Sequence, residues 1–291
     1  MIRKINLSDF VVLIFIIITG VIIVLGKEKT EYFSMLVSAR ITALLIIFIL
    51  IKLSTNNNNK LALFLWHFYP LLFMAYFYGE TGYYNNIFSP DLDEVFVQLE
   101  NSIFGSQPAL WFSLKYNSLW FNELMFFSYF SFYLIIIIFP IILFFKKNTE
   151  FEKSFFIIIF SSYTYYLFFA LFPVVGPQFY FPVEQVEISQ SFFWGEIIKF
   201  IQDIGETPTG AFPSSHVGLS WIILLISVKT FKKLSLLIFP FALLICFSTV
   251  YIKAHYVVDV IGGLISAPIL YLLGDKIYVL YNKKWPYVLI N

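Results

Sequence analysis

Apolar residues follow one another in runs of roughly 20 along most of this chain, and polar residues are concentrated between the runs. A helix of about that length crosses the hydrocarbon core of a bilayer. Because lipid offers no partners to backbone N–H and C=O groups, spans of this kind are helical. The pattern predicts an all-α, polytopic membrane bundle with about eight transmembrane helices, at residues 8–26, 35–53, 61–79, 120–145, 155–173, 214–228, 234–251 and 254–273.

Two connections, residues 80–119 and 174–213, are much longer than the others. Connections of this length are usually functional or disordered. After Asp93 the first connection mixes apolar and polar positions, which predicts one or two amphipathic helices lying at the membrane interface. The second connection is rich in Pro, Gly, Gln and Glu but also contains aromatic clusters, so we expect it to be ordered. The two together are expected to form a cap over one end of the bundle.

Composition narrows the possible classes of protein. Hydrophobic residues make up 59% of the chain and charged residues 13%, about half the charged share of an ordinary soluble domain. The net charge is +1 and no basic stripe is present, so a soluble enzyme, a disordered chain and a nucleic-acid-binding protein are excluded. The single cysteine, Cys246, excludes a disulfide framework and a thiolate metal cluster.

The basic residues predict the orientation. Eight spans put both termini on one side of the membrane, and most of the 19 Lys and Arg residues then lie on that side. Cytoplasmic loops carry the excess of Lys and Arg, so both termini are expected in the cytoplasm and the two long connections on the extracytoplasmic side. The basic residues on the extracytoplasmic side are Lys27, Lys29, Arg40, Lys115, Lys199 and Lys253.

The chain has three histidines, and two of them lie in chemically suggestive surroundings. His67 lies inside the third span and is interpreted as a core imidazole bonded to a neighbouring helix. His216 follows Pro213-Ser214-Ser215, a typical helix start, where first-turn N–H groups without intrahelical partners can bind phosphate. The alternative for His216 is an interfacial residue on a capped helix.

His255 and Asp259 are four residues apart, so on a helix their side chains meet. A carboxylate on one imidazole nitrogen fixes the tautomer and makes the other nitrogen a better nucleophile or base. The alternative is a structural His–Asp pair that braces two helices. The predicted spans put this pair, Lys253, His216 and Gln178 on the same side of the membrane, so we expect them to converge.

These segments resemble a known family. Pro213-Ser214-Ser215-His216 is similar to the second motif, Pro-Ser-Gly-His, of the type 2 phosphatidic acid phosphatase superfamily, and His255 to Asp259 matches the end of its third motif. The segments 92–108, 172–177 and 210–214 resemble its inositol phosphorylceramide synthase branch. The resemblance implies a vanadium-haloperoxidase-like phosphatase core, with residues 1–80 as N-terminal transmembrane helices and residues 81–291 as the catalytic membrane domain.

The resemblance also implies roles for individual residues. His255 attacks phosphorus to form a phosphohistidine, and Asp259 orients its imidazole. His216 protonates the leaving oxygen and then acts as a base for the acceptor. The implied reaction requires no metal and no other cofactor. The residues that the resemblance assigns to the substrate phosphate are Lys253, Ser214, Ser215 and Gln178.

Two positions depart from the family pattern. Ser248-Thr249 stands where the third motif usually reads Ser-Arg, and Gln178 stands where this branch tends to have Arg. Lys253 could supply positive charge, although an ammonium acts as a point charge and cannot form the two parallel hydrogen bonds of a guanidinium. The pocket is therefore expected to be less cationic than is usual in the family. Three explanations stay open. Another lysine such as Lys115 or Lys199 supplies the missing positive charge, the substrate carries less negative charge, as a phosphodiester does, or the activity is weak.

The favoured function is that of an integral-membrane phosphatase acting on lipid phosphates within the bilayer. One alternative is a phospho-head-group transferase of the inositol phosphorylceramide synthase type, which shares the covalent half-reaction. A second is a non-catalytic relative with a transport or scaffold role. Two further alternatives are a metal enzyme using His216, His255 and Asp259 as ligands, and a serine hydrolase using Ser214 or Ser215.

Overall fold

The computed structural model describes residues 6–54, 59–188 and 191–284, and within these ranges the secondary structure is entirely helical. The prediction of an all-α bundle is therefore confirmed. In the described residues seven helices are long and apolar enough to cross a membrane, and the sixth predicted span, residues 214–228, is a shorter apolar helix, α11, of 16 residues. The eight are α1 (Leu7–Leu25), α2 (Phe33–Ser54), α3 (Lys60–Glu80), α6 (Leu119–Lys146), α7 (Asn148–Leu171), α11 (Ser215–Thr230), α12 (Lys232–Tyr251) and α13 (Val257–Lys284).

Several helix ends differ from those predicted. Helix α7 begins before the apolar run, and α13 continues past it, because their polar turns remain helical after leaving the apolar stretch. Helix α13 also starts three residues later than predicted. Lys253 has a left-handed backbone (φ 67°), which few L-residues adopt, and it interrupts the helix between α12 and α13. This break creates the loop that carries His255.

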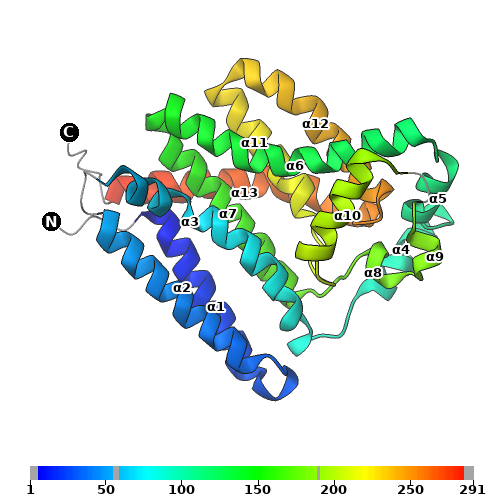
Figure 1. Cartoon of the computed structure of the whole chain (residues 1–291), viewed down its shortest axis with the longest axis horizontal. Coiled ribbons are helices and arrows are strands. Elements are labelled where there is room, and N and C mark those ends of the chain that lie inside the picture. The colour runs from blue at the N-terminus through cyan, green and yellow to red at the C-terminus, as the bar shows by residue number, and fades with distance from the viewer. Residues whose placement is uncertain (1–5, 55–58, 189–190, 285–291) are drawn as a thin grey trace.

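Helix α11 lies at the centre of the bundle, where it contacts α6, α7, α12 and α13. It is buried nearly all round, and Val217, Ile222 and Ile226 belong to the main apolar core. Helices α1 and α3 pack on α7, and α2 packs on α1 and α3 (Figure 1). A helix that is buried on all sides holds both its ends in fixed positions, so the start of α11 is a rigid place for functional groups.

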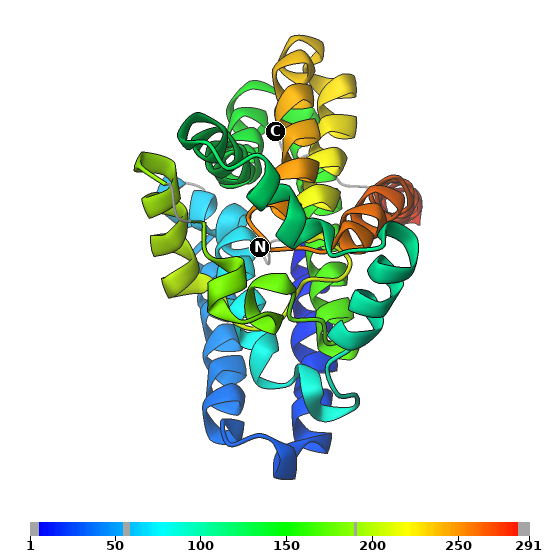
Figure 2. The same cartoon turned by 90° about the vertical axis from the view of Figure 1, so that its right-hand side faces the viewer.

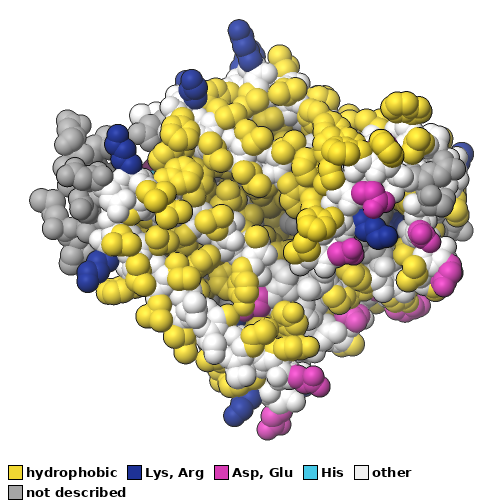
Figure 3. All heavy atoms as spheres, viewed as in Figure 1, with side chains coloured by type: hydrophobic (Ala, Val, Ile, Leu, Met, Phe, Trp, Pro, Cys, Tyr) yellow, Lys and Arg dark blue, Asp and Glu magenta, His cyan; other side chains and the backbone are white. Residues whose placement is uncertain are grey.

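The outer surface of the bundle is apolar. Large side chains such as Ile17, Phe48, Leu236 and Leu272 are more than half exposed. Figure 3 shows hydrophobic side chains over most of one face, with basic side chains along its left and upper edges and most acidic ones toward the right and bottom. Such a surface suits lipid rather than water. The protein is therefore a multi-pass membrane protein.

The two long connections form a group of short helices at one end. These are the 3-10 turns η2 (Thr81–Tyr83) and η3 (Asn85–Ile87), then α4 (Asp93–Phe104), α5 (Pro108–Lys115), α8 (Pro177–Tyr180), α9 (Val183–Val186) and α10 (Phe193–Gly205). Helices α4, α5, α8 and α9 gather at the end away from the start of α1 and the end of α13 (Figure 1). Figure 2 looks onto that end, with α4 and α10 on opposite sides and α8 and α9 between them.

Candidate active site

Two imidazoles from distant parts of the chain are in direct contact. The Nε2 atom of His255, in the loop before α13, lies 3.3 Å from Nδ1 of His216 in the first turn of α11. Both residues are buried, and the rings of Phe132 and Tyr129 lie with their centroids 4.4 and 4.8 Å from that of His216. The structure therefore brings the two histidines together in an apolar enclosure.

Asp259 lies on the other side of His255. Its Oδ2 atom is 3.5 Å from Nδ1 of His255, at the outer limit of a hydrogen bond, and accepts the Tyr256 N–H at 2.8 Å. Its backbone carbonyl accepts the Ser214 N–H at 3.0 Å. Asp259 is fully buried. It consequently lies beside the ring of His255 and links α13 to the start of α11.

The start of α11 has the geometry of an anion site. Ser214 is the N-cap, and its side chain accepts the Val217 N–H at 3.4 Å. Ser215 and His216 lie in the first turn, where N–H groups lack intrahelical partners and the helix dipole is positive. The lack of a side chain at Gly263 allows α13 to pack closely on the start of α11, because a Cβ at Gly263 would lie 2.6 Å from the Ser214 carbonyl oxygen.

Lys253 is a buried cation. Its side chain is 1% exposed, and its Nζ atom has no hydrogen-bond partner among the described residues. Burial lowers the pKa of Lys253 from 10.5 to about 8. The only other buried cation in the described ranges, Arg40, is paired with Glu80 at 3.0 Å. A buried ammonium without a partner is costly, so Lys253 is suited to bind an anion.

Gln178 is engaged by neighbouring side chains. Its amide donates to Oε2 of Glu206 at 2.6 Å and accepts from Gln202 at 2.9 Å. The other Glu206 oxygen accepts the Tyr129 hydroxyl at 2.9 Å, and Tyr129 packs on His216. The position that usually carries an arginine in the family is thus part of a network around a carboxylate. Sequence reasoning missed Glu206, although it lies just before the Gly210-Ala211-Phe212-Pro213 segment.

The other lysines considered as compensating charges are exposed. The Nζ atom of Lys115 lies over the rings of Trp111 and Tyr116, with centroid distances of 4.9 and 5.4 Å. Lys199 is exposed on α10. His67 lies away from the site, with Nδ1 3.4 Å from Oε1 of Glu152 on α7, which agrees with its interpretation as a core residue bonded to a neighbouring helix.

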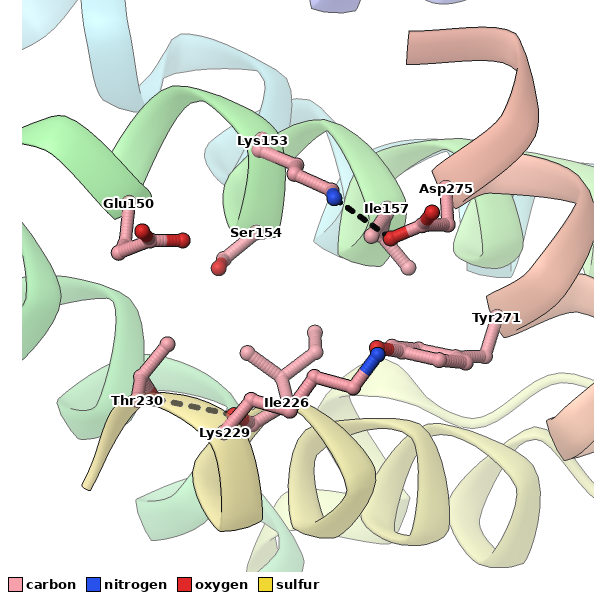
Figure 4. Close-up of a pocket in the computed structure, with 9 residues that line it drawn as sticks. All are labelled: Glu150, Lys153, Ser154, Ile157, Ile226, Lys229, Thr230, Tyr271 and Asp275. Atoms are coloured by element: carbon pink, nitrogen blue, oxygen red, sulfur yellow. Dashed lines mark hydrogen bonds and ion pairs between the residues drawn. The ribbon is translucent and has the colours of Figure 1, made fainter. Parts of the chain in front are cut away.

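A polar pocket between α7, α11 and α13 lies at a distance from the histidines (Figure 4). Its two lysines are engaged, since Lys153 pairs with Asp275 at 2.6 Å and the Lys229 Nζ lies 5.0 Å from the Tyr271 ring centroid. Lys229 follows His216 by 13 residues on α11, about 20 Å along the helix axis. This pocket is therefore separate from the candidate active site.

Comparison with known proteins gives a consistent result. Residues 95–273 match the family model described as the PAP2 superfamily. A segment of 68 residues is 32% identical to the inositol phosphorylceramide synthase catalytic subunit aur1 of Schizosaccharomyces pombe, covering 23% of this chain and 16% of that protein. A segment of 112 residues is 31% identical to an uncharacterized protein of Methanocaldococcus jannaschii, covering 38% of this chain and 43% of that protein. The chain thus spans less than half the length of either relative. No solved structure gives a significant match.

Proposed function

The chain belongs to the PAP2 superfamily, and we propose that it is an integral-membrane, metal-independent phosphatase that acts on lipid phosphates through a phosphohistidine intermediate. The observation that carries this proposal is the continuous chain of contacts from Asp259 through His255 to His216. A carboxylate, a nucleophilic imidazole and a second imidazole in that order supply the groups that phosphoryl transfer through histidine needs.

The proposed mechanism assigns the protons as follows. The carboxylate of Asp259, 3.5 Å from Nδ1 of His255, favours the tautomer with its proton on Nδ1, so Nε2 of His255 keeps its lone pair. Nδ1 of His216 then carries the proton that points at this lone pair. When a phosphate ester binds, its negative charge favours protonation of His216 to imidazolium. His255 Nε2 then forms a bond to phosphorus, the bond from phosphorus to the ester oxygen breaks, and the His216 imidazolium gives its Nδ1 proton to that oxygen and becomes neutral. In the second step His216 takes a proton from water, and the resulting hydroxide displaces the histidine to release phosphate.

The contact between the rings has to open for this reaction. A nucleophile approaches phosphorus at about 3 Å, the bond from phosphorus to the leaving oxygen lies beyond it, and the hydrogen bond to that oxygen adds about 2.8 Å, so the two ring nitrogens are more than about 6 Å apart during attack. In the resting protein they are 3.3 Å apart. Substrate binding therefore moves the His216 ring away from His255. Until then the two imidazoles satisfy each other in an apolar enclosure.

Charge on the phosphate is balanced by several weak groups. Lys253 supplies an ammonium, and Ser214, Ser215 and the first-turn amides of α11 supply hydrogen bonds at the positive end of a helix. Gln178 adds a neutral amide when it turns away from Glu206. Such fixed donors stabilise the negative charge that develops on the phosphoryl oxygens during transfer.

A head-group transferase is the second candidate. It uses the same phosphohistidine, but an alcohol replaces water in the second step. The network of Gln178, Gln202 and Glu206 favours this candidate, because amides and carboxylates bond well to hydroxyl groups. The similarity to the catalytic subunit of inositol phosphorylceramide synthase points the same way.

The proposed topology has both termini in the cytoplasm and the active site on the extracytoplasmic side. The start of α1 and the end of α13 lie at one end, whereas α4, α8 and α9 lie at the other (Figure 1). The bias of Lys and Arg toward the first end supports this orientation. The family match begins at residue 95, which supports residues 81–291 as the catalytic membrane domain and residues 1–80 as an N-terminal addition.

One assay separates these functions. The purified protein is incubated in detergent with EDTA and with phosphatidic acid, a prenyl diphosphate, phosphatidylglycerol phosphate or phosphatidylinositol, in the last case with and without an alcohol acceptor. Release of phosphate supports the phosphatase, and appearance of a new phosphodiester supports the transferase. His255→Ala should abolish both activities. If the EDTA-treated protein is inactive and a divalent ion restores turnover, the metal-independent mechanism is wrong. A scaffold role predicts no turnover in either protein.

A further inference from the structure

Helix α4 turns two of its three carboxylates toward the protein and several apolar side chains to the outside. Asp93 and Glu100, seven residues apart on one face, are fully buried. Val95, Leu99 and Ile103, on another face, are 59%, 43% and 59% exposed. This arrangement suits a helix at the membrane interface, with lipid on one side and polar backbone on the other. The two inward carboxylates play no part in the mechanism described above.

Glu100 caps a helix that lies far away in the sequence. Its Oε1 atom accepts the N–H groups of Val257 at 2.5 Å and Val258 at 3.3 Å, in the first turn of α13. First-turn N–H groups lack partners within their own helix, and a negative charge at a helix N-terminus is stabilising. Burial raises the pKa of Glu100 to about 7, and the two N–H bonds oppose that rise. The other oxygen, Oε2, is buried and has no hydrogen-bond partner among the described residues.

Asp93 anchors the other end of α4 to the same region. Its carboxylate accepts the N–H groups of Val175 and Gly176 at 2.8 and 2.9 Å and the hydroxyl of Tyr256 at 3.0 Å. Gly176 also packs on the loop before α13, since a Cβ there would lie 2.7 Å from the Ala254 carbonyl oxygen. Helix α4 therefore holds Tyr256, Val257 and Val258, the residues directly after His255, through two carboxylates.

We infer that Glu100 is a positioning residue, whose carboxylate fixes the first turn of α13 and so holds His255 and Asp259 in the geometry for attack on phosphorus. The inference rests on the proposed function. Val257 and Val258 lie between the two catalytic groups in the chain, so their two hydrogen bonds act where a small shift matters most. The rest of α13 is held by α11 and α7, so loss of the cap should disturb its first turn and leave the fold intact.

The test compares two substitutions at Glu100 with a matched control on the same helix. Glu100→Gln keeps an acceptor oxygen but removes the charge, and Glu100→Leu removes both. Glu94→Gln is the control, because Glu94 is exposed and its carboxylate accepts the Tyr180 hydroxyl instead. At pH 7.5 we expect kcat to fall about 10-fold in Glu100→Gln and about 100-fold in Glu100→Leu, with little change in KM, since a displacement of about 1 Å costs roughly that much. The control should keep wild-type kinetics.

A second measurement is independent of activity. Amide hydrogen exchange should be faster at Val257 and Val258 in Glu100→Leu, unchanged in Glu94→Gln, and unchanged in the middle of α13 in both variants. If Glu100→Leu shows faster exchange at Val257 and Val258 but the wild-type protein turns over no lipid phosphate, the proposed function is refuted and the capping contact of Glu100 is supported. Wild-type kcat in Glu100→Leu, a loss confined to KM, or unchanged exchange at the two valines would overturn the positioning role. If Glu100→Leu does not fold, Glu100→Gln with an unchanged melting temperature decides by its kcat.

Discussion

The charge on Lys253 gives the sharpest prediction, because its magnitude and its pH dependence both follow from the structure. The ammonium is buried without a partner, and its pKa is lowered by burial to about 8. A lysine is charged below its pKa, so the free protein offers a cation to phosphate below pH 8 and loses it above. A phosphomonoester is already a dianion above pH 7, so the substrate does not titrate in this window.

We therefore expect kcat/KM of the wild-type protein to fall about tenfold per pH unit above pH 8, since kcat/KM reports groups of the free enzyme. Replacing the ammonium by an apolar side chain in Lys253→Met removes a charge-assisted hydrogen bond of about 1.5–3 kcal/mol. This corresponds to a loss of about 10- to 150-fold in kcat/KM at pH 7. Lys253→Arg should move the decline to higher pH, because guanidinium stays charged. Lys199→Met, at an exposed lysine on α10, is the matched control.

The assay is the initial rate of phosphate release in detergent between pH 6 and 10 for these four proteins. The same ionisation has an opposite effect on stability. The unfolded chain binds the Lys253 proton up to about pH 10.5, whereas the folded protein releases it near pH 8, so the folded state gains stability as pH rises between these values. The reasoning is refuted if Lys253→Met keeps wild-type kcat/KM at pH 7, or if the decline above pH 8 persists in that variant.

Three further predictions concern the same site. Rapid quenching with a radiolabelled substrate should trap a phosphoprotein in the wild type that is labile in acid and stable in base, as phosphohistidine is. His255→Asn should give no such phosphoprotein. Label on the His255→Asn protein would mean that another residue is the nucleophile. Gly263→Ala puts a methyl group 2.6 Å from the Ser214 carbonyl oxygen and should cost about 1–3 kcal/mol of stability, seen as a lower melting temperature, whereas Gly20→Ala, whose nearest contact is 3.7 Å, should not. Gln178→Arg alone should gain little monoesterase activity, because the new guanidinium pairs with Glu206. The double variant Gln178→Arg/Glu206→Gln should have higher activity than the single variant. Equal activity in the single and the double variant would show that Glu206 does not hold the side chain at position 178.

The spans and the helix start before His216 could be predicted from the sequence because each depends on local information. An apolar run of sufficient length and a Pro-Ser-Ser segment specify helices without reference to distant residues. The contact of His255 with Asp259 was also predicted, although His255 lies in the loop before α13 and not on the same helix as Asp259. The helix ends were less predictable, since the polar turns at the start of α7 and the end of α13 are helical beyond the apolar run.

The carboxylate contacts could not be predicted, because they join residues that are far apart in the chain. Glu100 and Val257 are separated by 157 positions, and Gln178 and Glu206 by 28. In a soluble protein the charged face of an amphipathic helix points to water, and that expectation would make Glu100 a surface residue. At a membrane the apolar face of α4 is the outer one, so Asp93 and Glu100 turn inward and accept hydrogen bonds from backbone N–H groups. The spacing of apolar and charged residues along the sequence is the same in the soluble and the membrane case, so it does not predict which face of the helix is buried.

The acidic residues near the histidines leave the ammonium of Lys253 without a carboxylate partner. Asp93 and Glu100 accept hydrogen bonds from backbone N–H groups and a tyrosine hydroxyl, and neither pairs with Lys253. Glu206 is likewise bonded to neutral amides and a phenol. Under the proposed function a bound phosphate would depend on Lys253 and on the amides at the start of α11, which the bond from the Ser214 N–H to the Asp259 carbonyl oxygen holds in place. Asp259 would then couple the proposed phosphate-binding helix to the proposed nucleophile, and Glu100 bonds to the turn between His255 and Asp259.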